Sequence, residues 1–307
     1  MAIEARRVKE LRDRTGAGMM DCKRALTESG GNIDKAIAVL REKGLAGASK
    51  KAGRVAAEGL VAVFSRPDLS TAVLLELNCE TDFVAKTDEF SSLVSTAGTA
   101  LLHAGPGGEG DGDLVAGLSV EGGGTMAEFL KEGVASIGEN LGLRRFVRLE
   151  STDGAIGSYV HAGGKIGVVV EVAGAQAADE ELLRSLAMQI AAAIPRCVGR
   201  QEVSPEEIEK ERDIFAAQAR SSGKPEKVVD RIVDGKMDKY FREICLLEQE
   251  YVRDSDLTVA ALLEQAAEKK GSGLEIKRFF RFQLGEGVER KTANLADEVA
   301  AQIAQGS

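Results

Sequence analysis

One order of predicted elements occurs twice along the 307-residue chain and restricts its fold more than any other feature. Each copy consists of a strand, a turn, a second strand and an amphipathic helix. The strands fall near residues 60–64 and 72–77 in the first copy, and near 155–161 and 165–172 in the second. Such a repeat is typical of an α+β protein, so we predict two similar α+β core halves.

The two copies differ in the residues directly after the second strand. In the first, residues 78–86 read Asn-Cys-Glu-Thr-Asp-Phe-Val-Ala-Lys, which places Asp82 and Phe83 at a strand-to-helix junction. In the second, the corresponding residues are the neutral Gly174-Ala175-Gln176. A junction loop lies at the surface, whereas a phenylalanine gains from burial. Phe83 therefore either folds into its own core or is a wedge for a partner, and the pattern alone favours the core.

Three short helices are predicted within residues 1–53, which form a separate module. Glycines end these helices, the last of them at Gly44, and Asn32 can cap the third helix. Met19 and Met20 are adjacent in the second helix, and so short a helix has one face for its core. We therefore expect one of the two methionines to contact a partner. Residues 45–58, rich in Ala, Gly and Lys, are expected to form a hinge-like linker.

A helical hairpin is predicted for residues 204–242. Ser204 opens its first helix with a capping box, and proline occupies the first helical position. Both helices are highly charged and carry only a thin apolar stripe, formed by Ile208, Phe215, Val228 and Ile232. Any apolar remainder is expected to serve an interface, either between copies of this chain or with a partner.

The rest of the chain divides around this hairpin. Core half one takes residues 54–150, core half two takes 151–203 and 243–284, and a C-terminal module takes 285–307 with a helix that Asn294 can cap. Residues 103–124 are Gly-rich and acidic, so we expect a mobile surface loop with little to bury. This loop contains a GxGxxG pattern without the strand and helix that dinucleotide binding requires, and we reject that function.

Composition narrows the classes of function. The net charge is −9, which opposes broad phosphate-backbone binding, although residues 1–53 carry 12 Lys or Arg against 7 Asp or Glu. The positive charge of this module is typical of a protein that binds nucleic acid or an acidic protein surface, but also of helix faces that are merely solvated. Because no aromatic residues are interleaved with the basic ones, direct nucleic-acid binding is not expected. No apolar run approaches the ~20 residues of a membrane span, and no targeting peptide is visible, so we expect a cytoplasmic protein without membrane contact.

Chemistry-bearing motifs are also missing from the sequence. The four cysteines are scattered and there are two histidines, so no metal or other cofactor is expected. No phosphate-binding loop and no nucleophile elbow occurs, and the chain is not expected to be an enzyme. His161, at the end of a predicted hairpin, is by pattern alone a surface or structural residue.

Four motifs, in order along the chain, resemble the bacterial elongation factor Ts family. They are residues 8–23, the Thr-Asp-Phe-Val-Ala-Lys of 81–86, His161 with the Lys-Ile-Gly-Val of 165–168, and Gly285-Glu286-Gly287. The resemblance implies a ubiquitin-associated-like N-terminal bundle and a two-part core. It also implies a guanine nucleotide exchange factor of translation elongation, which binds elongation factor Tu, disturbs its Mg²⁺–nucleotide site and promotes GDP release.

The resemblance further assigns site residues. The nucleotide-exchange wedge would comprise Thr81, Asp82, Phe83 and Val84. The residues that contact elongation factor Tu elsewhere would include Arg12, Met19, Met20 and His161. Two other classes stay open on the residues alone: an adaptor that binds peptide or RNA through its N-terminal bundle, and an unrecognised enzyme. Release of labelled GDP from elongation factor Tu separates the exchange factor from both.

Overall fold

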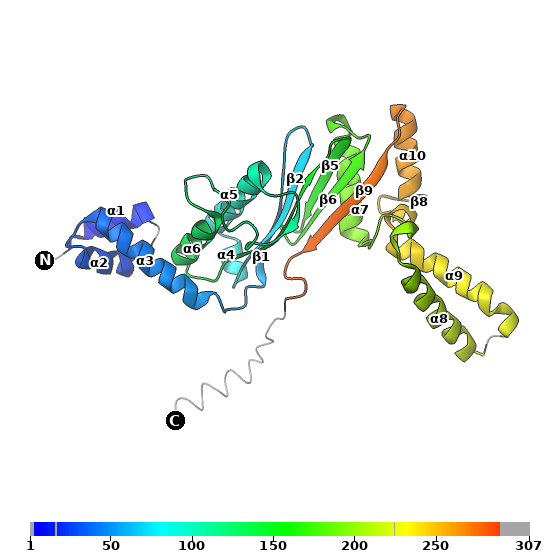
Figure 1. The fold of residues 1–307 in the computed structure, drawn as a ribbon, viewed down its shortest axis with the longest axis horizontal. Helices are drawn as coiled ribbons and strands as arrows, with labels where there is room; N and C mark the ends of the chain where they lie inside the picture. Colours follow the sequence, from blue (N-terminus) through cyan, green and yellow to red (C-terminus); the bar gives the residue numbers. More distant parts are fainter. Residues whose placement is uncertain (1–2, 16, 224, 289–307) are drawn as a thin grey trace, which may run out of the picture.

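The computed structural model describes residues 3–15, 17–223 and 225–288, and the side chains of 44–50 are outside this description. The molecule is elongated, with a helical bundle at one end, two β-sheets in the middle and a helical hairpin at the other end (Figure 1). Three N-terminal helices followed by mixed sheets and helices make it an α+β protein, as predicted. None of the helices within the described ranges is long and apolar enough to cross a membrane.

The N-terminal bundle consists of α1 (Ala5–Thr15), α2 (Met19–Glu28) and α3 (Ile33–Lys51). Its small core contains the buried side chains of Val8, Leu11, Cys22, Ala25, Leu26 and Ala36. The expected cap is present, since the Asn32 side-chain oxygen accepts a hydrogen bond from the Lys35 N–H at 2.9 Å. The prediction that α3 ends at Gly44 is wrong, and so is the hinge-like linker from residue 45. The alanines and lysines there favour helix, which offsets the ~1 kcal/mol cost of a glycine, and α3 packs against α6 (Met126–Ile137).

The first sheet has the antiparallel order β1-β2-β4-β3. Its strands are β1 (Glu58–Ser65), β2 (Thr71–Cys79), β3 (Gly108–Gly110) and β4 (Gly142–Glu150). Helices α5 (Asp88–Ala104) and α6 (Met126–Ile137) cover one face. Side chains alternate along a strand, so Val73, Leu75 and Leu77 of β2 face these helices. The residues between them face the second sheet.

The expectation that residues 103–124 have little to bury is wrong. Val115 and Val120 are 3% and 7% exposed and belong to the core beneath α5. Strand β3 pairs with β4, and a Cβ atom at Gly110 would lie 2.8 Å from the Phe146 ring. The high glycine content therefore allows close packing here.

The second sheet has the antiparallel order β5-β6-β9. Its strands are β5 (Gly154–His161), β6 (Ile166–Ala173) and β9 (Glu275–Gln283), and α7 (Glu180–Ala193) packs on its outer face. The inner faces of the two sheets form a shared core of Val61, Ala72, Leu74, Val147, Leu149, Ile156, Val169, Phe282 and Leu284. A backbone hydrogen bond of 2.8 Å from Val61 N to Gly164 O joins β1 to the turn between β5 and β6.

Both sheets carry a buried glutamate in the strand that is second in the sheet, β2 in the first and β6 in the second. Glu76 of β2 is 0% exposed and Glu171 of β6 is 6% exposed. The strand register shifts directly after each of them, between Glu76 and Leu77 and between Glu171 and Val172. The two sheets therefore share a structural irregularity as well as an order of elements.

The predicted helical hairpin is formed by α8 (Pro205–Ser221) and α9 (Glu226–Ile244). Its apolar contact is wider than the predicted thin stripe, because Val229, Val233, Met237 and Phe241 are buried in a cluster of their own. Its two ends meet at the core, where Leu246 N donates to Cys197 O at 2.9 Å.

Six short elements and one longer helix, α10, complete the described chain. They are α4 (Asp82–Ala85), η1 (Ala177–Asp179), η2 (Arg200–Glu202), η3 (Leu246–Glu248), β7 (Glu250–Tyr251), β8 (Asp254–Thr258) and α10 (Val259–Lys270). The helix predicted from Asn294, with Leu295, Val299 and Ile303, lies outside the described residues.

Candidate functional site

The segment that carries Asp82 and Phe83 is a single helical turn rather than a loop. Strand β2 ends at Cys79, and Thr81 caps α4 by accepting a hydrogen bond from Val84 N at 3.4 Å. A threonine hydroxyl at this position satisfies one of the free N–H groups of a helix start.

A carboxylate from a distant part of the chain holds this turn in place. One oxygen of Glu139 accepts hydrogen bonds from the N–H groups of Glu80 and Thr81, each at 3.0 Å, and the other accepts the Thr81 hydroxyl at 2.6 Å. In return, the Glu80 carboxylate accepts the N–H of Asn140 at 2.6 Å. Hydrogen bonds to a carboxylate are stronger than neutral ones, so this reciprocal contact fixes the start of α4.

The short helix directs its side chains in opposite directions. Ala85 is buried and Val84 packs against the first core, whereas Phe83 is 79% exposed. By contrast, Phe90 of the next helix is fully buried. The interpretation of Phe83 as a core residue is therefore wrong, and its ring is available to another molecule.

Asp82 lies beside this exposed ring and is half-exposed. Its carboxylate pairs with Lys86 at 2.7 Å, and this hydrogen bond lowers the pKa of Asp82, with a smaller contribution from the charge of Lys165. Asp82 is therefore ionised at neutral pH. The turn presents an ionised carboxylate, paired with Lys86, next to an apolar ring.

His161 lies at the exposed end of β5, where the Tyr159 hydroxyl is 2.9 Å from its Nδ1 atom. The following turn packs against β1 through Gly164, and Lys165 pairs with Glu58 of β1 at 3.2 Å. Helix α4 also packs against β1. The structure thus brings the His161 hairpin and the wedge segment to the same strand.

Arg12, Met19 and Met20 belong to a different surface. Met19 and Met20 are 46% and 61% exposed, and Arg12 is exposed as well. They lie on the N-terminal bundle, which stands apart from the part of the core that carries α4 (Figure 1). Neither methionine is buried in the core of the bundle, and the contact of one of them with a partner stays a prediction.

The described residues contain no group of three or more His, Cys, Asp or Glu side chains that could hold a metal ion. Cys79, next to the wedge segment, is buried, and this burial raises the pKa of its thiol to about 12. It therefore stays a protonated thiol and takes part in packing.

Sequence reasoning missed Glu139. It follows the end of α6, 58 positions after Thr81, and no motif or period relates the two residues. The turn thus combines an exposed aromatic ring with an ionised carboxylate, two features that protein–protein interfaces often contain.

The comparisons with known proteins place the chain in a family. Residues 80–286 match the family model described as "Elongation factor TS". The elongation factor Ts of Clostridium botulinum is 47% identical over 311 residues, covering 98% of this chain and 99% of that protein. Those of Clostridium perfringens and Magnetococcus marinus are 48% and 46% identical, covering 97% and 100% of this chain and 98% and 100% of those proteins. The chain belongs to the elongation factor Ts family, whose members are nucleotide exchange factors for elongation factor Tu in translation elongation and are not enzymes.

Proposed function

We propose that this chain releases GDP from elongation factor Tu by inserting the turn formed by Thr81, Asp82, Phe83 and Val84 beside the Mg²⁺–nucleotide site. The observation that carries the proposal is the 79% exposure of Phe83 on a turn whose other side is packed into the core. Contact between an exposed apolar ring and water is unfavourable. Burying the ring in a partner therefore stabilises the complex by about 1.5–3 kcal/mol.

The physical basis of exchange is linkage between two ligands. If the factor binds nucleotide-free elongation factor Tu more tightly than the GDP form, it weakens GDP binding by the same ratio. Mg²⁺ demands nearly ideal octahedral geometry, so a small displacement of its ligands is enough to weaken the binding of the nucleotide. Phe83 supplies the apolar wedge, and the ionised Asp82 supplies a charge that competes for hydrogen-bond donors or repels nearby phosphate.

The remaining partner contacts form part of the same proposal. Arg12, Met19 and Met20 dock the N-terminal bundle on an acidic, partly apolar surface of elongation factor Tu, and their exposure supports this. His161 is a third contact, supported by the packing of its hairpin against the strand that also supports α4. We propose no direct contact with nucleic acid or membrane. Because elongation factor Tu acts in translation elongation, we also propose a cytoplasmic location.

We also propose the five-part organisation: a ubiquitin-associated-like bundle (1–53), core halves 54–150 and 151–203 with 243–284, a hairpin (204–242) and a C-terminal module (285–307). The shared strand order and the buried glutamates Glu76 and Glu171 support two related halves. For self-association we propose the hairpin, which exposes the apolar side chain of Ile214 (39%) on α8.

The decisive experiment measures release of labelled GDP from purified elongation factor Tu. Catalytic amounts of this chain are expected to accelerate release, and Phe83→Ala is expected to abolish most of the acceleration. Leu114→Ala is the matched control, because Leu114 is an exposed apolar residue (60%) outside the wedge. Unaccelerated release with the native chain would refute the exchange function and favour an adaptor role.

A further inference from the structure

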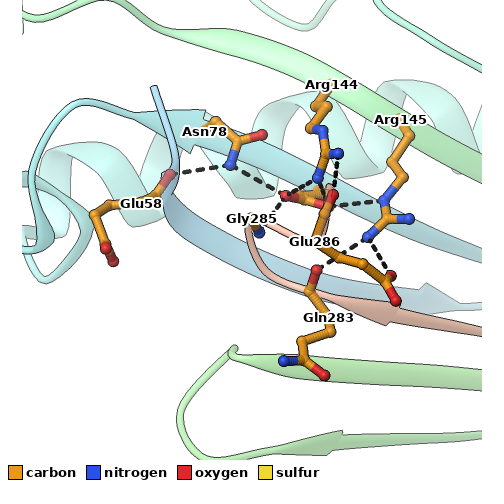
Figure 2. Close-up of polar contacts among 8 residues, drawn as sticks. Glu58, Asn78, Arg144, Arg145, Gln283, Gly285 and Glu286 are labelled. Carbon is orange, nitrogen blue, oxygen red and sulfur yellow. Dashed lines mark hydrogen bonds and ion pairs between the residues drawn. The ribbon is translucent and has the colours of Figure 1, made fainter. Parts of the chain in front are cut away.

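The carboxylate of Glu76, near the end of β2, is the centre of a buried polar cluster. Figure 2 labels the residues that surround this carboxylate, among them Asn78, Arg144, Arg145 and Gly285. Its Oε1 atom accepts hydrogen bonds from Arg144 at 2.9 Å, Asn78 at 3.1 Å and the N–H of Gly285 at 2.8 Å. Its Oε2 atom accepts from Arg145 at 2.7 Å and from Arg144 at 3.1 Å. Every contact except that of Asn78 comes from another part of the chain, so the cluster joins segments that the sequence separates.

One of these segments is the turn that follows β9. Arg145 donates to Gln283 O at 3.0 Å and to the Glu286 carboxylate at 3.3 Å, and its guanidinium stacks on the Phe282 ring at 4.2 Å. Gly285 has a φ of +70°, which a glycine adopts without strain and which lets its N–H point at Glu76. The direction in which the chain leaves β9 is therefore tied to Glu76.

Asn78 connects the Glu76 cluster to the segments that we propose face the partner. Asn78 donates to Glu76 and, at 3.1 Å, to the backbone oxygen of Glu58 (Figure 2). The Glu58 carboxylate in turn pairs with Lys165 on the His161 hairpin. Asn78 is also two residues before Glu80, where the contacts with Glu139 and Asn140 begin.

Stability alone does not account for a charge at this position. A buried ion pair often contributes no more than well-packed apolar residues of the same size. The neighbouring positions on the inner face of β2, such as Leu74, are apolar and fully buried. A leucine at position 76 would continue that pattern, but it would remove one acceptor from each of the two arginines and the acceptor of the Gly285 N–H.

We propose that Glu76 is a positioning residue for nucleotide exchange. It holds the wedge turn, the His161 hairpin and the start of the C-terminal segment at Gly285 in one fixed arrangement. This inference rests on the proposed function. It adds a residue that does not itself face the partner but sets where the partner-facing segments lie.

Glu76→Gln tests the inference, because it keeps the size of the side chain and removes the charge. Catalysed GDP release is expected to slow about tenfold, the effect of one weakened charge-assisted hydrogen bond. Amide hydrogen exchange is expected to rise in residues 80–87 and 284–288. Glu171→Gln is the matched control: Glu171 is buried at the same place in the other sheet and pairs with Arg278 at 2.8 Å within that sheet. It is expected to lower stability while leaving GDP release unchanged.

Three results would overturn the inference: a folded Glu76→Gln protein with native release, an equal loss in Glu171→Gln, or unchanged hydrogen exchange in both segments. Should the single variant not fold, Glu76→Gln combined with Arg145→Gln restores the charge balance. That protein is expected to release GDP as slowly, and native release by it would also refute the inference. If the native chain fails to accelerate GDP release, the proposed function is wrong, and the contrast in hydrogen exchange between the two variants still tests the positioning role.

Discussion

The carboxylate of Glu139 accepts a 2.6 Å hydrogen bond from the hydroxyl group of Thr81, a residue 58 positions earlier in the chain. The same carboxylate accepts the N–H groups of Glu80 and Thr81. The orientation of the wedge turn is thus set by a residue outside the wedge motif. Exchange activity is expected to depend on this support as much as on Phe83 itself.

The Glu139→Ala protein is expected to fold but to accelerate GDP release less. The substitution leaves two backbone N–H groups and one hydroxyl without their acceptor, which costs about 1–3 kcal/mol of stability. Urea denaturation and GDP release measure the two effects. Glu121→Ala is the control, since Glu121 is exposed in another segment. Native release by Glu139→Ala would show that α4 keeps its position without this contact.

Phe83→Ala is expected to leave stability within about 0.5 kcal/mol of the native value, because the removed ring is mostly exposed. Affinity for elongation factor Tu is expected to fall by about 10- to 150-fold, the equivalent of ~1.5–3 kcal/mol of lost burial. Phe90→Ala is the comparison, since Phe90 is fully buried and its loss costs about 3–5 kcal/mol. Thermal unfolding and binding titrations measure both quantities. Equal destabilisation by the two substitutions would contradict the exposed position of Phe83.

Met19→Gln combined with Met20→Gln is expected to weaken the complex with elongation factor Tu without changing the fold. Both side chains are exposed, so polar replacements do not disturb the core of the bundle. This substitution is cleaner than deletion of residues 1–53, because α3 packs against α6 and its removal would uncover core surface. A titration of the complex is the measurement, with Leu114→Gln as the control for an exposed apolar residue. Unchanged affinity would remove the N-terminal bundle from the interface.

The stability difference between the native protein and Glu76→Gln is expected to depend on pH. Burial opposes ionisation of Glu76, but hydrogen bonds from Gly285, Arg144, Asn78 and Arg145 outweigh it and lower its pKa below the ordinary 4.5. A carboxyl group with a lowered pKa stabilises the fold above its unfolded-state pKa, and this stabilisation is lost as the pH falls through the folded-state value. Urea denaturation between pH 7 and 3 should show a constant difference above about 4.5 that narrows below it. A difference that widens with acid would mean that the carboxyl is protonated in the native state.

Replacement of residues 205–240 by a short Gly/Ser linker is expected to leave a folded protein that still accelerates GDP release. The two ends of the hairpin meet at the core through Cys197 and Leu246, so a short linker can join them. Phe241 is retained because the Arg200 guanidinium stacks on it at 4.3 Å. Sedimentation of the same protein tests self-association, which is expected to decrease. Complete loss of exchange in a well-folded protein would place the hairpin in the interface with elongation factor Tu.

Local patterns were sufficient for most elements of this fold. Alternating and helical periods predicted the strands and the helices because burial follows those periods directly. The composition of a segment was misleading where a high glycine content hid residues that are buried or helical. The glycines of 103–124 concealed Val115 and Val120, which are buried, and the glycines after residue 43 did not end α3.

The sequence by itself determined the α+β class, the repeated order of elements and the position of the Asp82–Phe83 pair between β2 and α5. Only the tertiary structure decided which way Phe83 points, because a four-residue helix is too short to show a period. Only tertiary contacts identified Glu139 and the partners of Glu76. Glu139 lies 58 positions from Thr81, and Gly285 lies 209 positions from Glu76. Hydrogen bonds between such distant residues depend on how the strands and helices pack, and no local pattern records that packing.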